Sequence, residues 1–514
     1  MAKIYLGLIS LLLICGCKKD KSIPTTVTNL TVNTTSLTSV TLEAKNNKAL
    51  TADVVATING DQVNAVVPYM QNDKKLVLTF TAKDAANVTV NDTVQVSGTT
   101  LTDFTKPVSY KLTSAQGSTK TYTITIRNFT GLPILYLTTA APVVSKDDYV
   151  TGSLIINANS QFDQVKQNIA LSIKGHGNST WLMPKKPYRL KFNSKGDLLG
   201  MPAAKNWVLL ANYDDKTLLR NRFALDLGTK IGADFTPQSR FVEVVMNGVY
   251  QGNYLLTSLV EVDPNRVNIS ELNNGDTPAD QISGGYLLEI DVSATPDEYG
   301  FRTAKNLLFT IQSPDVPNAD QQTYIHNYVQ QTEDALFSAN FTDTTSGYAK
   351  YINSDSFVNY YLVEELMKNN DAVDWSSIYY YKDVNGKLGM GPIWDFDVAA
   401  GNVNYSDAKN PTGWWVQNAI WFNRLFQDPA FKQKVKTRWK AIKNNQIVEV
   451  MNSIDTNATY LDLSEKQNFT TWPILNVYVW PNQFVLGTYP AEVAELKKWL
   501  NERISWMDGQ ISAY

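Results

Sequence analysis

The pattern of apolar and polar positions changes once along the chain. Between about residues 27 and 129, short runs rich in β-branched or aromatic residues alternate with turn signals, as at 63–67, 76–80 and 121–126. Such runs are typical of half-buried strands. Roughly seven strands in about 100 residues is the pattern of a β-sandwich. Because its acids are scattered and it has no histidine, the region 27–130 is predicted to be a structural spacer domain.

Beyond this region, strand patterns come first and helical patterns follow. The strand candidates are 134–137, 169–174, 187–192, 207–212, 241–246, 250–256 and 285–292. Apolar residues at helical spacing mark 321–337, 354–367, 417–427, 429–443 and 490–511 as the main helices. Glu364 and Glu365 are expected on a solvated helix face. A strand-rich half followed by a helix-rich half predicts an α+β domain at 131–514.

The first residues have the features of a targeting signal. Lys3 precedes an apolar run at 4–14, which is too short to span a bilayer as a permanent helix and fits a signal peptide of residues 1–16. The run ends in LICGC, which resembles the lipobox of bacterial lipoproteins and implies a lipid on Cys17, followed by a tether at 17–26. Since both cysteines lie here, no disulfide or thiolate metal site is expected in the mature chain. We expect a membrane-anchored protein of the bacterial outer membrane, with the periplasmic or surface face left open.

Composition narrows the class of protein. An apolar content of 43% with 26 tyrosines and 12 tryptophans indicates a globular chain. At 514 residues it is too long for one typical core, so two or three domains are expected. The formal charge of −3 argues against a dedicated nucleic-acid binder, which would carry a basic field.

The first candidate for chemistry is the stretch GPIWDFDVAAGN at 391–402. In an extended segment, Asp395 and Asp397 would point to one side, with Trp394 and Phe396 on the other. Two neighbouring carboxylates repel each other, which raises the pKa of each unless a cation lies between them. Mg²⁺, Mn²⁺ or Ca²⁺ suits such all-oxygen ligands. The alternative is a solvated turn that carries two acids.

The second candidate is a glycine loop at 175–181 between two predicted strands. In the strand after it, alternation places Arg189 and Lys191 on one face and apolar residues on the other. Glycine lets backbone N–H groups approach an anion and lysine neutralises its charge, so these elements could clamp a phosphate. A hairpin with a solvated basic face would have the same pattern.

Phosphoryl transfer requires such parts together in one site. It needs a glycine loop over the phosphates, a strand lysine, a divalent metal held by carboxylates, and a carboxylate that orients the acceptor hydroxyl. In chain order, the sequence offers the loop 175–181, Lys191, Asp371 as candidate base, and Asp395 with Asp397 as metal ligands.

At these residues the chain resembles the spore coat protein H (CotH) kinase family, an atypical branch of the protein-kinase-like fold. The matching stretches are GHGNSTW at 175–181, KKPYRLKF at 185–192, KNWVLLA at 205–211, LRN at 219–221, NGVYQGNY at 247–254, GGYLLEID at 284–291 and GPIWDFD at 391–397. The resemblance runs from about residue 132 to the C-terminus and implies a two-lobed kinase-like domain. The region before it resembles the immunoglobulin-like spacer modules of Bacteroidetes surface proteins.

The resemblance also implies an activity and a site. Known members phosphorylate serines of spore coat proteins, which implies an ATP- and Mg²⁺- or Mn²⁺-dependent protein kinase acting on serine or threonine. Asp371 would be the catalytic acid, and Asp395 and Asp397 the metal ligands. The implied nucleotide-binding residues are Gly175, Gly177, Asn178, Ser179 and Lys191, with Arg189 and Lys186 as alternatives to the lysine. The acceptor, a protein or a glycan, and the oligomeric state stay open.

Two positions depart from the family pattern. Ser258 stands where many members have a glutamate, so one acidic contact is expected to be missing, and Ser376 stands where a kinase catalytic loop has a metal-binding asparagine. A hydroxyl is a poorer ligand than an amide oxygen. The acidic partner of the nucleotide-binding lysine is left open among Asp226, Glu243 and Glu289.

Two other functions are compatible with the sequence. One is a surface protein without catalysis that recognises a glycan or a protein through exposed aromatic rings. Its candidates are Trp375, Trp414, Trp415 and Trp421, although each fits core packing as well. The other is a retaining glycosidase that uses Glu289 and Asp291, two acids on one face of a strand.

Overall fold

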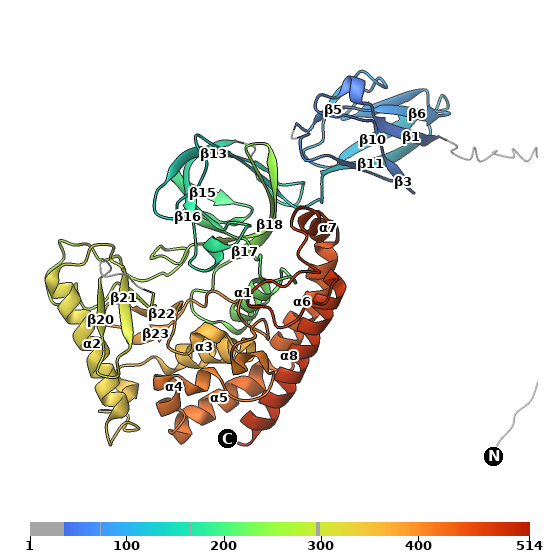
Figure 1. The fold of residues 1–514 in the computed structure, drawn as a ribbon. Helices are drawn as coiled ribbons and strands as arrows, with labels where there is room; N and C mark the ends of the chain where they lie inside the picture. Colours follow the sequence, from blue (N-terminus) through green and yellow to red (C-terminus); the bar gives the residue numbers. More distant parts are fainter. Residues whose placement is uncertain (1–34, 72, 165–166, 294–298) are drawn as a thin grey trace, which may run out of the picture.

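A computed structural model describes residues 35–71, 73–164, 167–293 and 299–514. Along the chain it forms a β-sandwich, a closed barrel, and a larger lobe in which helices surround a small sheet (Figure 1). The predicted signal peptide, the lipidation site Cys17 and the tether lie outside the described residues. Among the described residues, no helix combines the length and the apolar character that a membrane span needs.

The first part is the predicted β-sandwich. Its strands are β1 (Ser36–Leu42), β2 (Val54–Val55), β3 (Thr57–Asn59), β4 (Gln62–Val67), β5 (Lys75–Val77), β6 (Thr79–Lys83), β7 (Asn87–Val90), β8 (Thr93–Val94), β9 (Leu101–Asp103), β10 (Val108–Thr113) and β11 (Thr119–Asn128). The sheet orders are β3-β4-β11-β10-β7-β8, β2-β1-β6 and β5-β9. Val40 of β1 and Ile124 of β11 belong to one buried core, so two sheets pack face to face. The predicted strand 76–80 is divided between β5 and β6 because the chain changes sheets there.

The second part is a barrel, whose closure the strand patterns did not predict. Its strands are β12 (Ile134–Thr139), β13 (Val150–Asn157), β14 (Asn168–Gly175), β15 (Tyr188–Leu198), β16 (Met201–Leu210), β17 (Ser239–Met246) and β18 (Val249–Ser258), in the order β12-β13-β14-β15-β16-β18-β17. Parallel pairing of β12 with β17 closes it. Helix α1 (Arg220–Ile231) connects β16 to β17 and ends at Gly232, whose φ of 66° is left-handed. The Asn247-Gly248 hairpin is confirmed between β17 and β18.

The third part combines a sheet with most of the helices. The sheet order is β20-β21-β19-β22-β23, with β19 (Tyr286–Ile290), β20 (Gly300–Arg302), β21 (Leu308–Ser313), β22 (Ile378–Lys382) and β23 (Leu388–Met390). The helices are α2 (Ala319–Phe337), α3 (Ser354–Met367), α4 (Ile420–Leu425), α5 (Pro429–Ile442), α6 (Gln446–Tyr460), α7 (Asp462–Thr471) and α8 (Tyr489–Ser512). The α+β class is therefore confirmed. Helices α6 and α7 were not predicted, and the predicted helix 417–427 is shorter, as α4.

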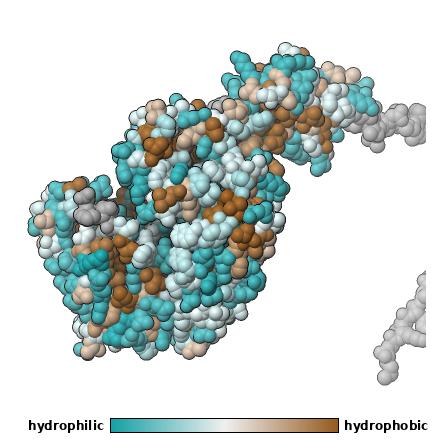
Figure 2. Space-filling view, in the orientation of Figure 1, coloured by the Kyte–Doolittle hydropathy of each residue, from teal (hydrophilic) through white to brown (hydrophobic). Residues whose placement is uncertain are grey.

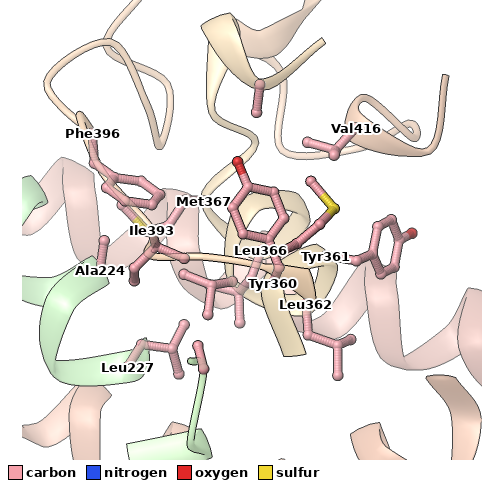
Figure 3. Packing of buried hydrophobic residues seen from close by; sticks show 14 of the residues in the cluster. Ala224, Leu227, Tyr360, Tyr361, Leu362, Leu366, Met367, Ile393, Phe396 and Val416 are labelled. Carbon is pink, nitrogen blue, oxygen red and sulfur yellow. The ribbon is translucent and has the colours of Figure 1, made fainter. Parts of the chain in front are cut away.

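Helix α3 is the centre of this lobe and is buried on nearly every side. Its Leu362, Leu366 and neighbouring residues lie in one cluster with Ala224 and Leu227 of α1, as Figure 3 shows. Ile393 and Phe396, from the stretch that carries the two candidate metal ligands, enter the same cluster. The apolar core therefore fixes that stretch against both α1 and α3.

The expectation that Glu364 and Glu365 lie on a solvated face is wrong. Both side chains are fully buried, since Arg503 of α8 covers Glu365, and Glu364 lies beside Asn369 and Asp395. Glu365 pairs with the equally buried Arg503 at 2.5 Å and accepts hydrogen bonds from the backbone N–H groups of Trp415 and Gln417. Burial raises the pKa of Glu364 well above its ordinary value. The buried pair of Glu365 and Arg503 thus joins α3 to α8, at a position that the helical pattern predicted to be exposed to solvent.

Candidate active site

A cavity of about 1180 Å³ lies between the barrel and the third part of the molecule. We call its lining residues from 146–261 the barrel wall and those from 289–480 the lobe wall. The cavity brings together most of the predicted site residues, which are Gly175, Gly177, Asn178, Ser179, Arg189, Lys191, Asp371, Asp395 and Asp397. Elements more than 150 residues apart in the sequence therefore meet in one place.

The glycine loop owes its glycines to its own fold. A Cβ at position 175 would lie 2.5 Å from the ring of Trp181, and one at Gly177, where φ is 79°, would lie 2.2 Å from the Thr180 hydroxyl. The loop therefore closes over Trp181 only with glycine at both positions. Its tip reaches across the cavity, because the Asn178 amide donates to the Ser293 hydroxyl at 3.2 Å.

Two of the lysines in this region have structural contacts. Lys186 is not among the described residues that line the cavity. Its ammonium donates to the Trp181 carbonyl at 2.7 Å and lies 5.2 Å from the centre of the Trp181 ring, so Lys186 supports the glycine loop. Lys185 is buried and donates to the Ala211 carbonyl at 2.8 Å and to Asn468 at 2.9 Å. Burial lowers the pKa of Lys185 to about 7.

The barrel wall presents cations. In β15, Tyr188, Leu190 and Phe192 belong to the barrel core while Arg189 and Lys191 line the cavity, as the alternation predicts. The ring of Tyr149 lies 5.0 Å from the Lys174 ammonium and 5.9 Å from that of Lys191. Burial, together with Arg189 and Lys174, lowers the pKa of the cavity-lining His176 to about 4, so this imidazole is neutral at physiological pH.

An acid missed in the sequence lies on this wall. Ser258 does not line the cavity as described, but Glu261, three residues further on, does. Glu261 accepts from the Asn206 amide at 2.6 Å and pairs with Arg266. Burial raises its pKa, while Arg266 and Arg189 oppose the shift. Glu261 thus brings a carboxyl to the cavity three residues after Ser258, and the weak signal for it was its place just after the strand end.

Of the three proposed acidic partners of Lys191, only Glu289 is among the described residues that line the cavity. Asp226 pairs with Arg222 at 2.8 Å. Glu243 accepts from the hydroxyls of Thr130 and Tyr250, both at 2.6 Å. Neither lines the cavity as described, so both predictions are wrong. Glu289 lines it and hydrogen-bonds to Tyr379.

The stretch that carries Asp395 and Asp397 does not have the extended backbone that we assumed. It is a loop after β23 in which Asp395 is left-handed, with φ of 66°. Apolar anchoring of its flanks overrides the extended form, since Trp394 and Phe396 are buried. The two carboxyls still meet, because they share a hydrogen bond and both line the cavity.

Helix α1 holds this loop from the other side. The Asn221 side-chain oxygen accepts from the Phe396 backbone N–H at 2.8 Å. The Arg220 guanidinium donates to the carbonyls of Ala399 at 3.0 Å and Ala400 at 3.3 Å, and pairs with Asp215 at 2.6 Å. The short stretch 219–221 is therefore a positioning element, a role that its sequence did not indicate.

Crowding of carboxyls dominates the electrostatics of the lobe wall. Burial, and then Asp371, raises the pKa of Asp395 to about 6, and burial with Asp214 and Asp395 raises that of Asp397 well above its usual range. Burial raises the pKa of Asp214 to about 7, with Asp215 and Asp395 adding to the shift. One Asp214 oxygen is buried without a hydrogen-bond partner. Buried acids of this kind favour a nearby cation.

The residues present fit a divalent metal ion. The donors are carboxylate oxygens, which Mg²⁺ and Mn²⁺ prefer. Within the described ranges, no three His, Cys, Asp or Glu side chains converge as a complete metal cage. That agrees with Mg²⁺ sites in which one or two carboxylates bind the ion and phosphate or water oxygens complete its coordination.

Asp371 follows α3 in a short 3₁₀ turn, Asn370–Ala372. The Asn370 amide donates to its carboxylate at 2.7 Å, and burial raises its pKa, with Asp291 adding to the shift. Ser376 lines the cavity, with its hydroxyl 3.4 Å from that of Ser377. It is Ser377 that touches a candidate metal ligand, since its hydroxyl donates to Asp395 at 3.3 Å.

The predicted aromatic residues divide between surface and core. Trp375 and Trp415 line the cavity. Trp421 is buried and donates from its indole N–H to Glu333 at 3.0 Å, while Trp414 packs against Trp506. Core packing is thus the role of Trp414 and Trp421.

Comparison with protein families shows which family the part of the chain around this cavity belongs to. A family model described as "CotH kinase protein" matches residues 173–507, more than half of the chain, and one described as "SGBP, N-terminal" matches 45–126. The chain therefore belongs to the CotH family. With its N-terminal β-sandwich module, it is a CotH protein of the kind found among Bacteroidetes-type surface proteins.

The other comparisons add little. No curated protein matches the chain. Among solved structures, the chain is similar to a putative glycoside hydrolase from Bacteroides thetaiotaomicron, with 18% identity and a TM-score of 0.15, over 34% of this chain and 51% of that one. The likeness thus spans about half of that hydrolase chain and carries no argument about fold or function.

Proposed function

We propose that the CotH domain catalyses transfer of the γ-phosphoryl group of ATP to a hydroxyl group, of serine or threonine in the simplest case. The observation that supports this best is the pairing of a cationic barrel wall with an acidic lobe wall across one cavity. Phosphoryl transfer depends mainly on positioning and charge neutralisation, which two such walls would provide.

Each wall would have its own task. The backbone of the loop 175–179 and the side chains of Arg189 and Lys191 would bind the phosphates of ATP. Asp395 and Asp397 would hold Mg²⁺ or Mn²⁺, which when bound neutralises charge on the phosphates. Asp371 would orient the acceptor hydroxyl and take its proton. Burial raises the pKa of Asp371. As the pH falls, Asp371 would therefore take up a proton, and activity would be lost, at a higher pH than for an exposed aspartate.

We further propose that the chain is attached to the bacterial outer membrane through lipid on Cys17. The lipobox-like sequence before Cys17 supports this. The SGBP N-terminal match, which fits a Bacteroidetes-type surface protein, supports the location. The β-sandwich would then be a spacer between membrane and cavity.

A second candidate function is a CotH-type binding protein without catalysis, which recognises a glycan or a protein. Trp375, which lines the cavity and is 57% exposed, favours it, since exposed rings are common at recognition sites. In that case, the acids of the lobe wall would serve binding alone.

Calorimetric titration with ATP, with and without Mg²⁺, separates the two functions. We expect metal-dependent binding that is weakened at least about tenfold by Asp395→Asn/Asp397→Asn, since the variant keeps the shape of the site but loses two charges. Lys230→Met is the control, because Lys230 pairs with Glu449 and does not line the cavity as described. If the unchanged protein binds no ATP at millimolar concentration, phosphoryl transfer is excluded.

A further inference from the structure

Two aromatic rings that the sequence did not single out stand beside the candidate base. Tyr405 and Trp480 lie parallel, with planes 8° apart and centroids 5.8 Å apart. Both line the cavity, and they are 54% and 48% exposed. They come from separate loops, one after the Asp395–Asp397 stretch and one between α7 and α8. We call this pair the aromatic plate.

The side chain of Asn370 links the plate to Asp371. The side-chain amide of Asn370 donates to the Tyr405 hydroxyl at 3.1 Å and to the Asp371 carboxylate at 2.7 Å. The Ser406 hydroxyl in turn donates to the Asn370 oxygen at 2.6 Å. A molecule lying on the plate would thus lie one amide away from the group proposed to take the acceptor's proton.

The polarity around the plate differs from that of the rest of the cavity. The lysine and arginine residues described as lining the cavity are Lys146, Lys174, Lys185, Arg189 and Lys191, all from the barrel wall. Near the plate the polar groups include amides, hydroxyls and the carboxylates of Asp371 and Asp397. In the view of Figure 2 the apolar surface is divided into separate patches among hydrophilic residues. A flat apolar ring beside such groups suits a ligand with one apolar face and a rim of hydroxyls.

The lobe wall is less suited to an extended peptide. A peptide that binds by adding a strand to a sheet needs an open sheet edge. Strand β23, the edge next to the metal-ligand stretch, is buried, and its Leu388 exchanges backbone hydrogen bonds with Tyr351 and Asn353. This edge is therefore already occupied.

We propose that the acceptor of this site is a carbohydrate, with one sugar ring on an outer face of the stacked Tyr405–Trp480 pair and one hydroxyl of the carbohydrate at Asp371. The proposal rests on the proposed phosphoryl transfer and names its acceptor. The hydroxyl oxygen forms a bond to the γ-phosphorus of ATP as the bond from that phosphorus to the β-γ bridging oxygen breaks. The hydroxyl proton passes to Asp371, and the products are ADP and a sugar phosphate monoester.

The first experiment measures sugar binding in the absence of nucleotide. The full chain is titrated, by calorimetry and tryptophan fluorescence, with maltohexaose, cellohexaose, xylohexaose, mannohexaose and chitohexaose. We expect at least one to bind, with affinity reduced about tenfold or more by Trp480→Ala and by Tyr405→Ala. Phe484→Ala is the matched control, since Phe484 lies exposed in the same α7–α8 loop but does not line the cavity as described.

The second experiment follows labelled phosphate from ATP to the bound hexaose, with dephosphorylated casein as the protein acceptor. Phosphate on the sugar, reduced by Trp480→Ala, supports the proposal. If the protein binds the sugar but binds no ATP and transfers no phosphate, the proposed phosphoryl transfer is excluded. The role of the sugar as acceptor is then excluded too, and the plate is only a sugar-binding site.

Three results overturn the sugar site itself. One is that no hexaose binds at millimolar concentration. A second is equal loss of sugar binding in Trp480→Ala and Phe484→Ala. The third is that Trp480→Ala weakens ATP binding while no hexaose binds, which would place a nucleobase on the plate. Transfer to casein in a protein that binds no hexaose would support a protein kinase and exclude the carbohydrate acceptor.

Discussion

The two walls of the cavity are built in different ways. The barrel wall takes two of its cations, Arg189 and Lys191, from the regular alternation of one strand, β15, whose other face fills the barrel core. The lobe wall takes Asp371, Asp395 and Asp397 from loops and short turns after α3 and β23, and Asp395 there has a left-handed backbone. A regular strand fixes its side chains locally, whereas these loops depend on distant contacts from α1. The acidic wall is therefore the one that substitutions outside the cavity should disturb.

The largest effect should come from Asp371→Asn. The amide cannot take a proton, so the rate of phosphoryl transfer should fall about 10²- to 10⁴-fold while ATP affinity is retained. Asp374→Asn is the control, because Asp374 accepts from the Ile420 backbone N–H and has a structural role. Steady-state kinetics and calorimetry measure the two quantities. A rate that stays within the error of the unchanged protein would remove Asp371 from the mechanism.

The next largest effect should be on stability, through the anchor of the acidic wall. Arg220→Met leaves Asp215 buried without its partner and frees the carbonyls of Ala399 and Ala400, so the free energy of unfolding should drop by about 3–5 kcal/mol. Arg222→Met, two residues along the same helix, removes a partly exposed pair with Asp226 and should cost about 1 kcal/mol. Urea denaturation compares them. Equal losses would contradict the anchoring role of Arg220.

A smaller effect is expected on the barrel wall. Arg189→Met/Lys191→Met should weaken ATP binding about 10- to 100-fold and leave the folded structure intact, since both side chains point away from the barrel core. The loss should shrink as salt is added, because screening weakens the contribution of these charges in the unchanged protein. Calorimetry at two salt concentrations provides the test. Unchanged affinity at low salt would show that the phosphates do not lie on this wall.

The last effect, which is spread over several pH units, should be a change in pH dependence. The pKa of Asp214 is raised from 3.8 to about 7, so the folded state keeps this proton to higher pH than the unfolded chain does. Its contribution to stability is present below pH 4 and is lost as the pH rises towards 7, at no more than about 1.4 kcal/mol per pH unit. Asp214→Asn should therefore lose less stability between pH 4 and 7 in chelator. Melting temperatures of both proteins give the slopes, and identical slopes would exclude this assignment.

The sequence predicted best what local periodicity determines. The faces of β15, the Asn247-Gly248 hairpin and the extent of α3 follow from residue spacing and turn chemistry, and the structure has them as predicted. The order of loop, lysine and acids along the chain also pointed to residues that meet in one cavity.

What the sequence could not predict depends on contacts between distant segments. Closure of the barrel requires β12 to pair with β17, about 100 residues later. Glu365 carries no mark of the α8 contact that buries it, and Glu364 none of its place beside Asp395. Glu261 faces the cavity because the chain turns after β18. Tyr405 and Trp480 are 75 residues apart and form a pair only in the folded chain.

The central claim is that both walls bind one ligand, and a crystal structure with Mn²⁺ and a non-hydrolysable ATP analogue tests it most directly. We predict an anomalous Mn²⁺ peak at Asp395 and Asp397, with phosphates between it and the side chains of Arg189 and Lys191. A nucleotide bound elsewhere, or a cavity that stays free of nucleotide and metal at millimolar concentrations of both, would contradict the account.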